Sequence, residues 1–222
     1  MALQAEEEET IERLKAWWKE NGQRLVTIVV VVVAGYSSWI FWQNSQTATV
    51  SAASDLYEQV LSLAVTDGQT EVGAEDRQTI IALSEQLRSE FADTDYARFA
   101  AMYAAQQYVA MDELASAEAS LRWILDNPRS GLFSQPDEAL ELTASLRLGR
   151  VLLAQGEAEA ALQLVNSVDP QSFEASYAEL RGDIYVAMDR VVDAREAYTA
   201  AQQAGSTSSW LQMKMNSLAD ES

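Results

Sequence analysis

The sequence of 222 residues contains no cysteine and no histidine. It therefore offers no thiol nucleophile, no imidazole base and no Ser/His/Asp triad, and nearly every type of structural zinc site is excluded. Because a chain without cysteine forms no mispaired disulfides, an oxidising compartment is permitted. Proline and glycine are scarce as well, with 3 and 9 copies. Together with abundant Ala, Leu, Glu and Gln, this composition predicts helix almost throughout.

Basic residues are also few, since 15 stand against 34 acidic ones and give a formal net charge of −19. Such a surface repels phosphate backbones, so we expect no nucleic acid among the partners, and it disfavours lying flat on anionic lipid. Residues 43–222 hold 28 of the acidic and 11 of the basic side chains. Electrostatic steering favours basic or neutral partners for this part, although an acidic surface often serves only solubility.

Residues 25–42 form a run of 18 residues without a charge. The five consecutive valines from Val29 to Val33 have strand propensity, but strands buried on both faces run only about 4–8 residues. As a helix, such a run at about 1.5 Å per residue spans about 27 Å, close to the roughly 30 Å hydrocarbon core of a bilayer. Tryptophans flank the run at both ends, as is typical of membrane interfaces. We therefore predict a transmembrane helix.

The flanks of this run predict its orientation. Four basic residues precede it, and none follows before Arg77, so the positive-inside rule places the N-terminus in the cytoplasm and the larger part outside. A cleaved signal peptide is the alternative, because small residues (TATVSAA) follow the run, although its length exceeds the usual 7–15 residues of a signal. The tail of residues 1–24 is either an interfacial helix that ends near Asn21-Gly22 or a solvated segment that only sets topology.

A repeated helical pattern follows the apolar run. Three segments align with one another, AAQQYVAMDELASAEASL, LGRVLLAQGEAEAALQLV and RGDIYVAMDRVVDAREAY. In each, a small residue precedes an alanine by twelve positions, and the pairs are Ala105/Ala117, Gly149/Ala161 and Gly182/Ala194. A bulky residue comes four positions after each alanine, at Leu121, Val165 and Tyr198. The small residues would let two antiparallel helices approach closely, and the bulky ones would pack between neighbouring pairs. A unit of about 34 residues with this logic is typical of tetratricopeptide repeats.

The remaining segments complete this stack. The spacing from Ala117 to Ala161 is longer than one unit, and the excess falls in DNPRSGLFSQPDE, which predicts a loop between pairs. A more degenerate first pair is predicted at residues 50–65 and 75–91. The segment SSWLQMKMNSLAD would cap the last pair, although its Met-rich stripe could instead form a partner groove. The residues of that stripe are Trp210, Leu211, Met215 and Leu218.

The predicted fold is therefore all-α. A cytoplasmic acidic tail and juxtamembrane helix (residues 1–24) lead into a single N-terminal transmembrane helix (residues 25–42). A tetratricopeptide-like α-solenoid of about four helix pairs with a C-terminal capping helix follows (residues 43–222).

With its parts in this order, the chain resembles the YfgM-like family, the ancillary SecYEG translocon subunits. The matching segments run nearly end to end and include KAWWKENGQRLV, GYSSWIFWQ, SAASDLYEQVL, LRLGRVLLAQGEAEAAL, LRGDIYVAMDRVVDAREAY and LQMKMNSLAD. The resemblance implies a single-pass protein of the bacterial inner membrane with a periplasmic tetratricopeptide domain. It also implies association with the SecYEG translocon and with a membrane-anchored periplasmic isomerase-like chaperone, to assist exported unfolded proteins. It implies no enzymatic activity. The valine run and the loop around Pro128 to Pro136 depart from the family pattern.

Acidic residues are numerous enough that carboxylate pairs arise by chance. A glycosidase dyad could be sought at Asp93/Asp95, Glu157/Glu159 or Asp112/Glu113, but acidic residues at turns and on exposed helix faces are ordinary. A Ser/Lys dyad would need Lys214, which lies in the predicted capping helix. We therefore predict no catalytic residue, no bound metal and no cofactor.

The predicted partner-binding site is the concave face of the stack, formed by the first helix of each pair. An extended peptide or a partner helix could lie across this mixed apolar and polar strip, unless several of its residues only pack the stack. The predicted residues are Phe99, Met102, Gln106, Val109, Thr143, Leu146, Arg150, Leu153, Ser176, Glu179, Asp183 and Val186. The function expected from the sequence is an anchored scaffold or chaperone beside the exporter. The alternative is a tetratricopeptide-type assembly factor or scaffold for another envelope complex.

Overall fold

A computed structural model describes residues 2–65, 72–128 and 137–220 of the chain, with side chains for residues 10–218 of these ranges. It divides into two compact units, Met1–Ser51 and Ala52–Ser222. The prediction of an all-α fold is confirmed, because the described ranges contain only helices and their connections. The helices are α1 (Ala2–Ala64), α2 (Ala74–Glu90), α3 (Asp95–Ala110), α4 (Leu114–Asp126), α5 (Glu138–Ala154), α6 (Ala158–Ser167), the 3-10 turn η1 (Gln171–Phe173), α7 (Glu174–Ala187), α8 (Val191–Gln203) and α9 (Ser209–Asp220).

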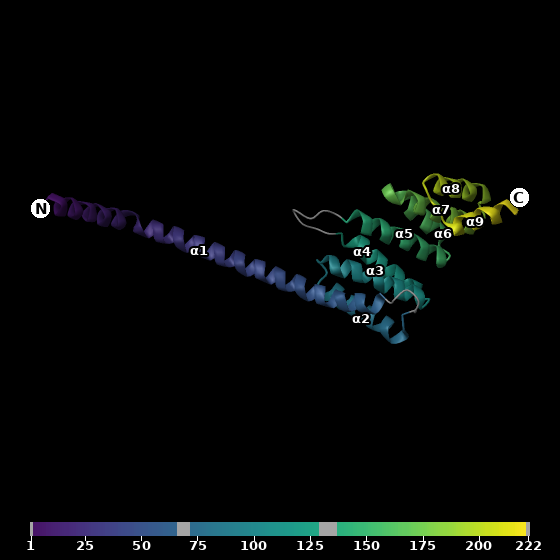
Figure 1. Cartoon of the computed structure of the whole chain (residues 1–222), viewed down its shortest axis with the longest axis horizontal. Coiled ribbons are helices and arrows are strands. Elements are labelled where there is room, and N and C mark those ends of the chain that lie inside the picture. Colours follow the sequence, from purple (N-terminus) through teal and green to yellow (C-terminus); the bar gives the residue numbers. More distant parts are fainter. Residues whose placement is uncertain (1, 66–71, 129–136, 221–222) are drawn as a thin grey trace. The chain divides into compact units, whose positions relative to one another are not determined.

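The first unit consists of helix α1 up to Ser51 (Figure 1). It includes the apolar run, whose side chains are exposed and which is long and apolar enough to cross a membrane. The expected helix end near Asn21-Gly22 is wrong, because α1 continues through both residues. The Trp18 indole packs over Gly22, where an added Cβ would lie 3.1 Å from the ring. Asn21 donates a hydrogen bond from its side chain to the Trp17 carbonyl oxygen at 3.3 Å, so it too is accommodated within the helix.

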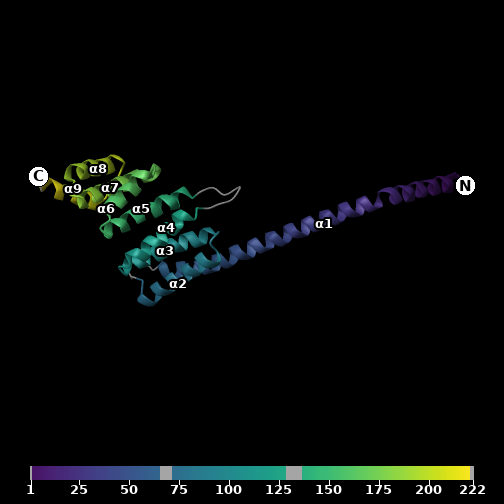
Figure 2. The same cartoon turned by 180° about the vertical axis from the view of Figure 1, so that it is seen from behind.

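The second unit is a stack of helix pairs. Helices adjacent in the chain are adjacent in space from α2 to α9, and the two opposite views in Figures 1 and 2 show the same order. The pairs are α3/α4, α5/α6 and α7/α8. Before them, the end of α1 from Ala53 onward shares one cluster of buried residues with α2 and the start of α3. Contacts between α3 and α5 and between α5 and α7 join the first helices of successive pairs. Helix α4 ends at Asp126 and α5 begins at Glu138. Most of the segment predicted as a loop between pairs, residues 129–136, lies outside the described part.

The small residues in the first helices allow the close approach expected of them. A Cβ added to Gly149 would lie 2.9 Å from Leu180 Cδ2 and 3.4 Å from Val165 Cγ2, and one added to Gly182 would overlap the Tyr198 ring. The expectation that the bulky residues pack between neighbouring pairs needs correction. Tyr198 packs on the glycine of its own pair, because it lies one turn beyond the alanine on the face of α8 that meets α7.

The turns inside the pairs share one backbone conformation. The residue seven positions after each small residue has a positive φ, which is 60° at Asp112, 83° at Gly156 and 59° at Asp189. In each turn the next residue donates its N–H to the carbonyl oxygen five positions earlier, at distances of 2.8–2.9 Å. This bond pattern satisfies carbonyls at the helix end. A left-handed residue therefore reverses the chain at the same place in three pairs.

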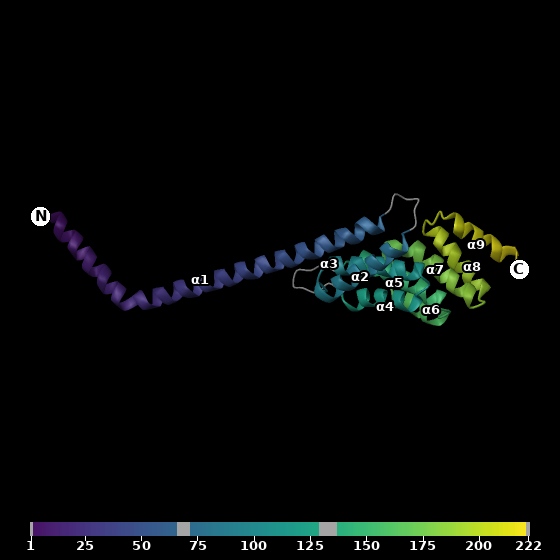
Figure 3. The ribbon, with the colours of Figure 1, turned by 90° about the horizontal axis from the view of Figure 1, so that it is seen from below.

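Helix α9 caps the last pair, as predicted. Its Leu211 and Leu218 are buried in one cluster with Ala194, Tyr198 and Ala201, and the view from below in Figure 3 shows α9 next to α8. Trp210 does not belong to this apolar stripe, since it is 68 % exposed. Leu211, Met215 and Leu218 follow the spacing of four and three residues that defines one helix face, and Trp210 falls outside that spacing.

Candidate functional site

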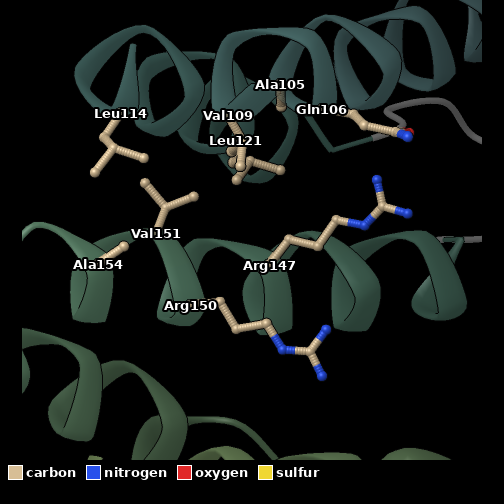
Figure 4. A pocket seen from close by; sticks show the side chains of 9 residues that line it. All are labelled: Ala105, Gln106, Val109, Leu114, Leu121, Arg147, Arg150, Val151 and Ala154. Atoms are coloured by element: carbon tan, nitrogen blue, oxygen red, sulfur yellow. The ribbon is translucent and has the colours of Figure 1, made fainter. Parts of the chain in front are cut away.

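Two adjoining cavities lie along the first helices of the second and third pairs, α3 and α5. One has a volume of about 280 Å³ and the other of about 480 Å³. Both are lined by Gln106 of α3 and Arg147 of α5, so they form a continuous depression that we call the α3/α5 groove. The lining of the smaller cavity is Ala105, Gln106, Val109, Leu114, Leu121, Arg147, Arg150, Val151 and Ala154 (Figure 4). The larger is lined by Tyr57, Phe99, Met102, Tyr103, Gln106, Asp137, Ala139, Leu140, Thr143 and Arg147.

The structure brings part of the predicted concave face together in this groove. The four residues predicted on α3 all line it, namely Phe99, Met102, Gln106 and Val109. On α5, Thr143 and Arg150 line the groove as well. Leu146 is instead buried in the main core, and Leu153 packs against that core.

Two of the four predicted positions on α7 contact the capping helix α9. Lys214 of α9 binds the carboxylates of Glu179 at 2.9 Å and Asp183 at 2.8 Å. Asp183 also accepts a hydrogen bond from the Tyr198 hydroxyl at 2.7 Å. Val186 is exposed. These contacts engage the two acidic residues within the fold. Ser176, the remaining predicted residue on α7, is half-buried.

The contacts among Lys214, Glu179, Asp183 and Tyr198, which we call the Lys214 cluster, perturb two pKa values. Burial and the hydrogen bond to Asp183 raise the pKa of the Tyr198 hydroxyl. For Lys214, burial opposes the charged form, but the bonds to Asp183 and Glu179 outweigh it and raise the pKa of the ammonium group.

Sequence reasoning missed several lining residues, of which Arg147 is the most informative. It lies three positions before Arg150 on α5, and a second basic residue at this spacing was the signal available in the sequence. In Figure 4 the Arg147 guanidinium reaches towards Gln106, whereas Arg150 extends away from Gln106 along the other side of α5. Burial lowers the pKa of Arg147, the nearby Arg150 charge lowers it further, and Tyr103 acts in the opposite direction.

These two arginines lack a charged partner among the described residues. Within the part of the chain that the structure describes, Arg147 and Arg150 take part in no ion pair and no hydrogen bond with another residue. Most other cations of the same unit are engaged. Arg88, Arg98, Arg122, Arg190 and Lys214 each pair with a carboxylate at 2.7–3.2 Å.

Aromatic side chains form one wall of the larger cavity. The ring of Tyr57 lies 5.5 Å from Tyr96, 6.2 Å from Phe99 and 6.4 Å from Tyr103, measured between centroids. Burial, followed by the interaction with Tyr103, raises the pKa of Tyr57 to about 12. Tilted rings at these separations attract one another. The wall therefore consists of aromatic rings packed against one another.

The carboxylate pairs considered for catalysis lie at helix starts and turns. Asp93, Asp112 and Glu113 are exposed, as are Glu157 and Glu159 at the start of α6. Asp95, half-buried, is the first residue of α3. No group of three or more potential metal ligands occurs among the described residues. In the groove itself, Arg147 lines both cavities, Arg150 lines the smaller one, and apolar side chains make up much of the remaining lining.

Comparison with known proteins relates the whole chain to one family. Residues 15–220 match the family model of the tetratricopeptide repeat-like domain. A relative from Haemophilus influenzae is 33% identical over 220 residues, which cover 98% of this chain and 100% of that protein. Relatives from Escherichia coli and Neisseria gonorrhoeae are 29% and 28% identical, with 98% of this chain and 99% and 100% of those proteins covered. All three are named ancillary SecYEG translocon subunit. No solved structure gives a significant match.

Proposed function

Because the chain belongs to the tetratricopeptide repeat-like family of ancillary SecYEG translocon subunits, we propose that it is a membrane-anchored scaffold or chaperone associated with the SecYEG translocon. The observation that carries this proposal is the end-to-end match to relatives of that name, which covers 98% of the chain. An apolar helix followed by a stack of helix pairs fits such a role, since the helix holds the binding domain beside the channel.

In this proposal the protein crosses the bacterial inner membrane once, with its N-terminus in the cytoplasm and its helix-pair domain in the periplasm. The orientation is supported by Arg13, Lys15, Lys19 and Arg24 before the apolar run and by the lack of basic residues from there to Arg77. Orientation can be tested because the chain has no cysteine. Single variants Gln4→Cys and Gln203→Cys would be labelled in intact cells with a membrane-impermeant maleimide. We expect labelling of the second alone once the outer membrane is permeabilised; the reverse pattern would contradict the topology.

The proposed partners are the SecYEG translocon, a membrane-anchored periplasmic isomerase-like chaperone and exported unfolded proteins. The α3/α5 groove is the proposed contact for extended segments, since repeat stacks bind peptides and helices along such faces. Anchoring raises the effective concentration of the groove near an emerging chain, so that weak binding suffices. The proposed role contains no catalytic step.

Co-purification tests this function. The full-length protein is extracted from membranes under gentle conditions, and its companions are identified by mass spectrometry beside a variant that lacks residues 1–42. We expect channel subunits and a periplasmic chaperone with the full chain and their loss with the truncated one. Enrichment of a different envelope complex would overturn the translocon role in favour of the assembly-factor alternative.

A further inference from the structure

The α3/α5 groove is lined by positive charge that no carboxylate of the described residues pairs with. The second unit is strongly acidic, with 28 acidic and 11 basic residues from position 43 onward, so carboxylates are abundant on it. Nevertheless Arg147 and Arg150 have no carboxylate partner among the described residues. Placing two like charges one turn apart on a helix is unfavourable unless something else compensates them. An anion from outside the chain would supply that compensation.

The surroundings of Arg147 define where such an anion would lie. The guanidinium reaches across from α5 towards Gln106 of α3 (Figure 4), and both residues line both cavities. On one side lie the aliphatic side chains of Val109 and Val151, and on the other the aromatic wall around Phe99. Because the groove continues on both sides of the cation, a passing chain fits better than a chain end, and its charge would come from a side chain.

We propose that the α3/α5 groove binds an extended peptide segment with an Asp or Glu side chain flanked, two positions away on each side, by apolar side chains. This proposal specifies the ligand of the proposed function. It rests on that function because it takes the α3/α5 groove as the place where the domain holds its partner segments. In an extended chain, every second side chain points to the same face, about 7 Å apart. An apolar-x-acid-x-apolar pattern therefore presents one carboxylate to Arg147 and one apolar group to each cavity.

The two arginines have different roles in this recognition. Arg147 provides the direct contact, because its planar guanidinium can donate two parallel hydrogen bonds to a carboxylate. Arg150, whose side chain extends away from Gln106, adds positive potential at the groove edge. The acidic remainder of the domain opposes binding only weakly, since charges beyond about 10 Å are screened at 0.1 M salt. Asp137, at the far end of the larger cavity, already accepts a hydrogen bond from the Leu140 N–H at 3.0 Å.

Binding of short fluorescent peptides to the full-length protein in detergent micelles tests the proposal. The probe carries a Leu-Ser-Glu-Ser-Val core, and its matched controls replace Glu by Gln, Glu by Lys, or both apolar residues by Ser. A charge-assisted hydrogen bond predicts that the Glu probe binds about tenfold tighter than the Gln probe. The difference should shrink as salt is raised. Equal affinity of the Glu, Gln and Lys probes would overturn recognition of a carboxylate.

Protein variants locate the contact. Arg147→Gln should lower affinity for the Glu probe about tenfold and leave the Gln probe unchanged, whereas Arg150→Gln should have a smaller effect. Arg147→Lys keeps the charge and should fall between Arg147→Gln and the parent chain. Arg190→Gln is the matched control, since Arg190 is paired with Asp193 at 2.7 Å and does not line the groove. Thermal unfolding of each variant shows whether it is folded.

Failure of the peptide-binding inference can be distinguished from failure of the proposed translocon role. If Arg147→Gln binds the Glu probe as well as the parent chain does, the inference is wrong, whatever co-purifies. If the Glu probe binds as expected but no channel subunits co-purify with the full chain, the groove chemistry stands and the translocon role fails. Binding of the Ser-flanked probe as tightly as the Leu/Val probe would overturn the assigned role of the two cavities.

Discussion

Gly149 and Gly182 occupy the same position in two successive helix pairs, and we expect the same substitution by alanine to have different costs there. At Gly149 the nearest atom to an added Cβ is Cδ2 of Leu180, at 2.9 Å. This is the terminal methyl of a flexible side chain, which can move aside. At Gly182 the new methyl would overlap the ring of Tyr198, which is 2 % exposed and is held by its hydrogen bond to Asp183.

The free-energy cost of Gly182→Ala can be worked out from the contacts that the Tyr198 ring would lose. Overpacking of a buried site costs about 1–3 kcal/mol. Displacing the ring also stretches the 2.7 Å hydrogen bond from Tyr198 to Asp183, and a bond to a charged group contributes about 1.5–3 kcal/mol. Alanine regains about 1 kcal/mol of helix propensity over glycine. We therefore expect Gly182→Ala to lower the free energy of unfolding by about 2–4 kcal/mol, and Gly149→Ala to change it by about 1 kcal/mol or less.

Urea unfolding of the full-length protein in micelles, followed by far-ultraviolet circular dichroism, measures both values. Combining Gly182→Ala with Tyr198→Leu provides the control, because a smaller side chain at position 198 removes the overlap. In that background Gly182→Ala should cost much less, so the two changes should be non-additive. Equal costs at both glycines, or additivity of the double variant, would refute the packing argument.

Three further predictions concern single contacts. Gly156→Ala should destabilise the domain by about 1–2 kcal/mol, because φ is 83° there; an unchanged urea midpoint would contradict the shared turn. Tyr177→Phe should cost about 1 kcal/mol, since its buried hydroxyl donates to the Leu142 carbonyl oxygen at 2.8 Å; unaltered thermal unfolding would argue against that bond. Lys214→Met should cost about 1 kcal/mol at pH 8. The raised pKa of Lys214 means that its contribution is present below the ordinary value of 10.5 and is lost as pH rises through the folded value. The difference between the parent chain and this variant should therefore shrink above about pH 10.5, and a constant difference would count against the ion pairs.

The repeated spacing was sufficient to predict the helix pairs and their close contacts. Twelve residues from Gly182 to Ala194 accommodate two helical segments and a turn, and the required absence of a side chain at Gly182 is visible in the structure. Which helix pair the bulky side chains pack against was harder to predict from the sequence. Spacing shows that Tyr198 lies one turn from Ala194, but whether it packs on its own pair or on the next depends on how the helices cross.

The residues that line the groove were predicted only in part, because they too depend on how the helices are oriented. Counting outward from the small residues identified the α3 side, where Gln106 follows Ala105 directly. It failed for Arg147 and for Leu146, which is buried, because the tilt of α5 decides which side of that helix faces the open groove. It also failed to show that Lys214 covers Glu179. That contact joins residues 35 positions apart, and nothing in the local sequence signals it.

The raised pKa values of Lys214 and Tyr198 also fix the protonation of these two side chains near neutral pH. The Lys214 ammonium group and the Tyr198 hydroxyl both have pKa values raised from ordinary values that are already strongly alkaline, and the chain has no histidine that could titrate nearby. Histidine is the side chain whose ordinary pKa lies near neutrality, whereas the ordinary pKa values of lysine and tyrosine lie at about 10. Because both values are raised further here, neither the lysine nor the tyrosine changes protonation between about pH 6 and 9. The cation that joins the capping helix α9 to α7 therefore stays charged throughout this range, and the contact does not depend on a proton taken up or released by Lys214 or Tyr198.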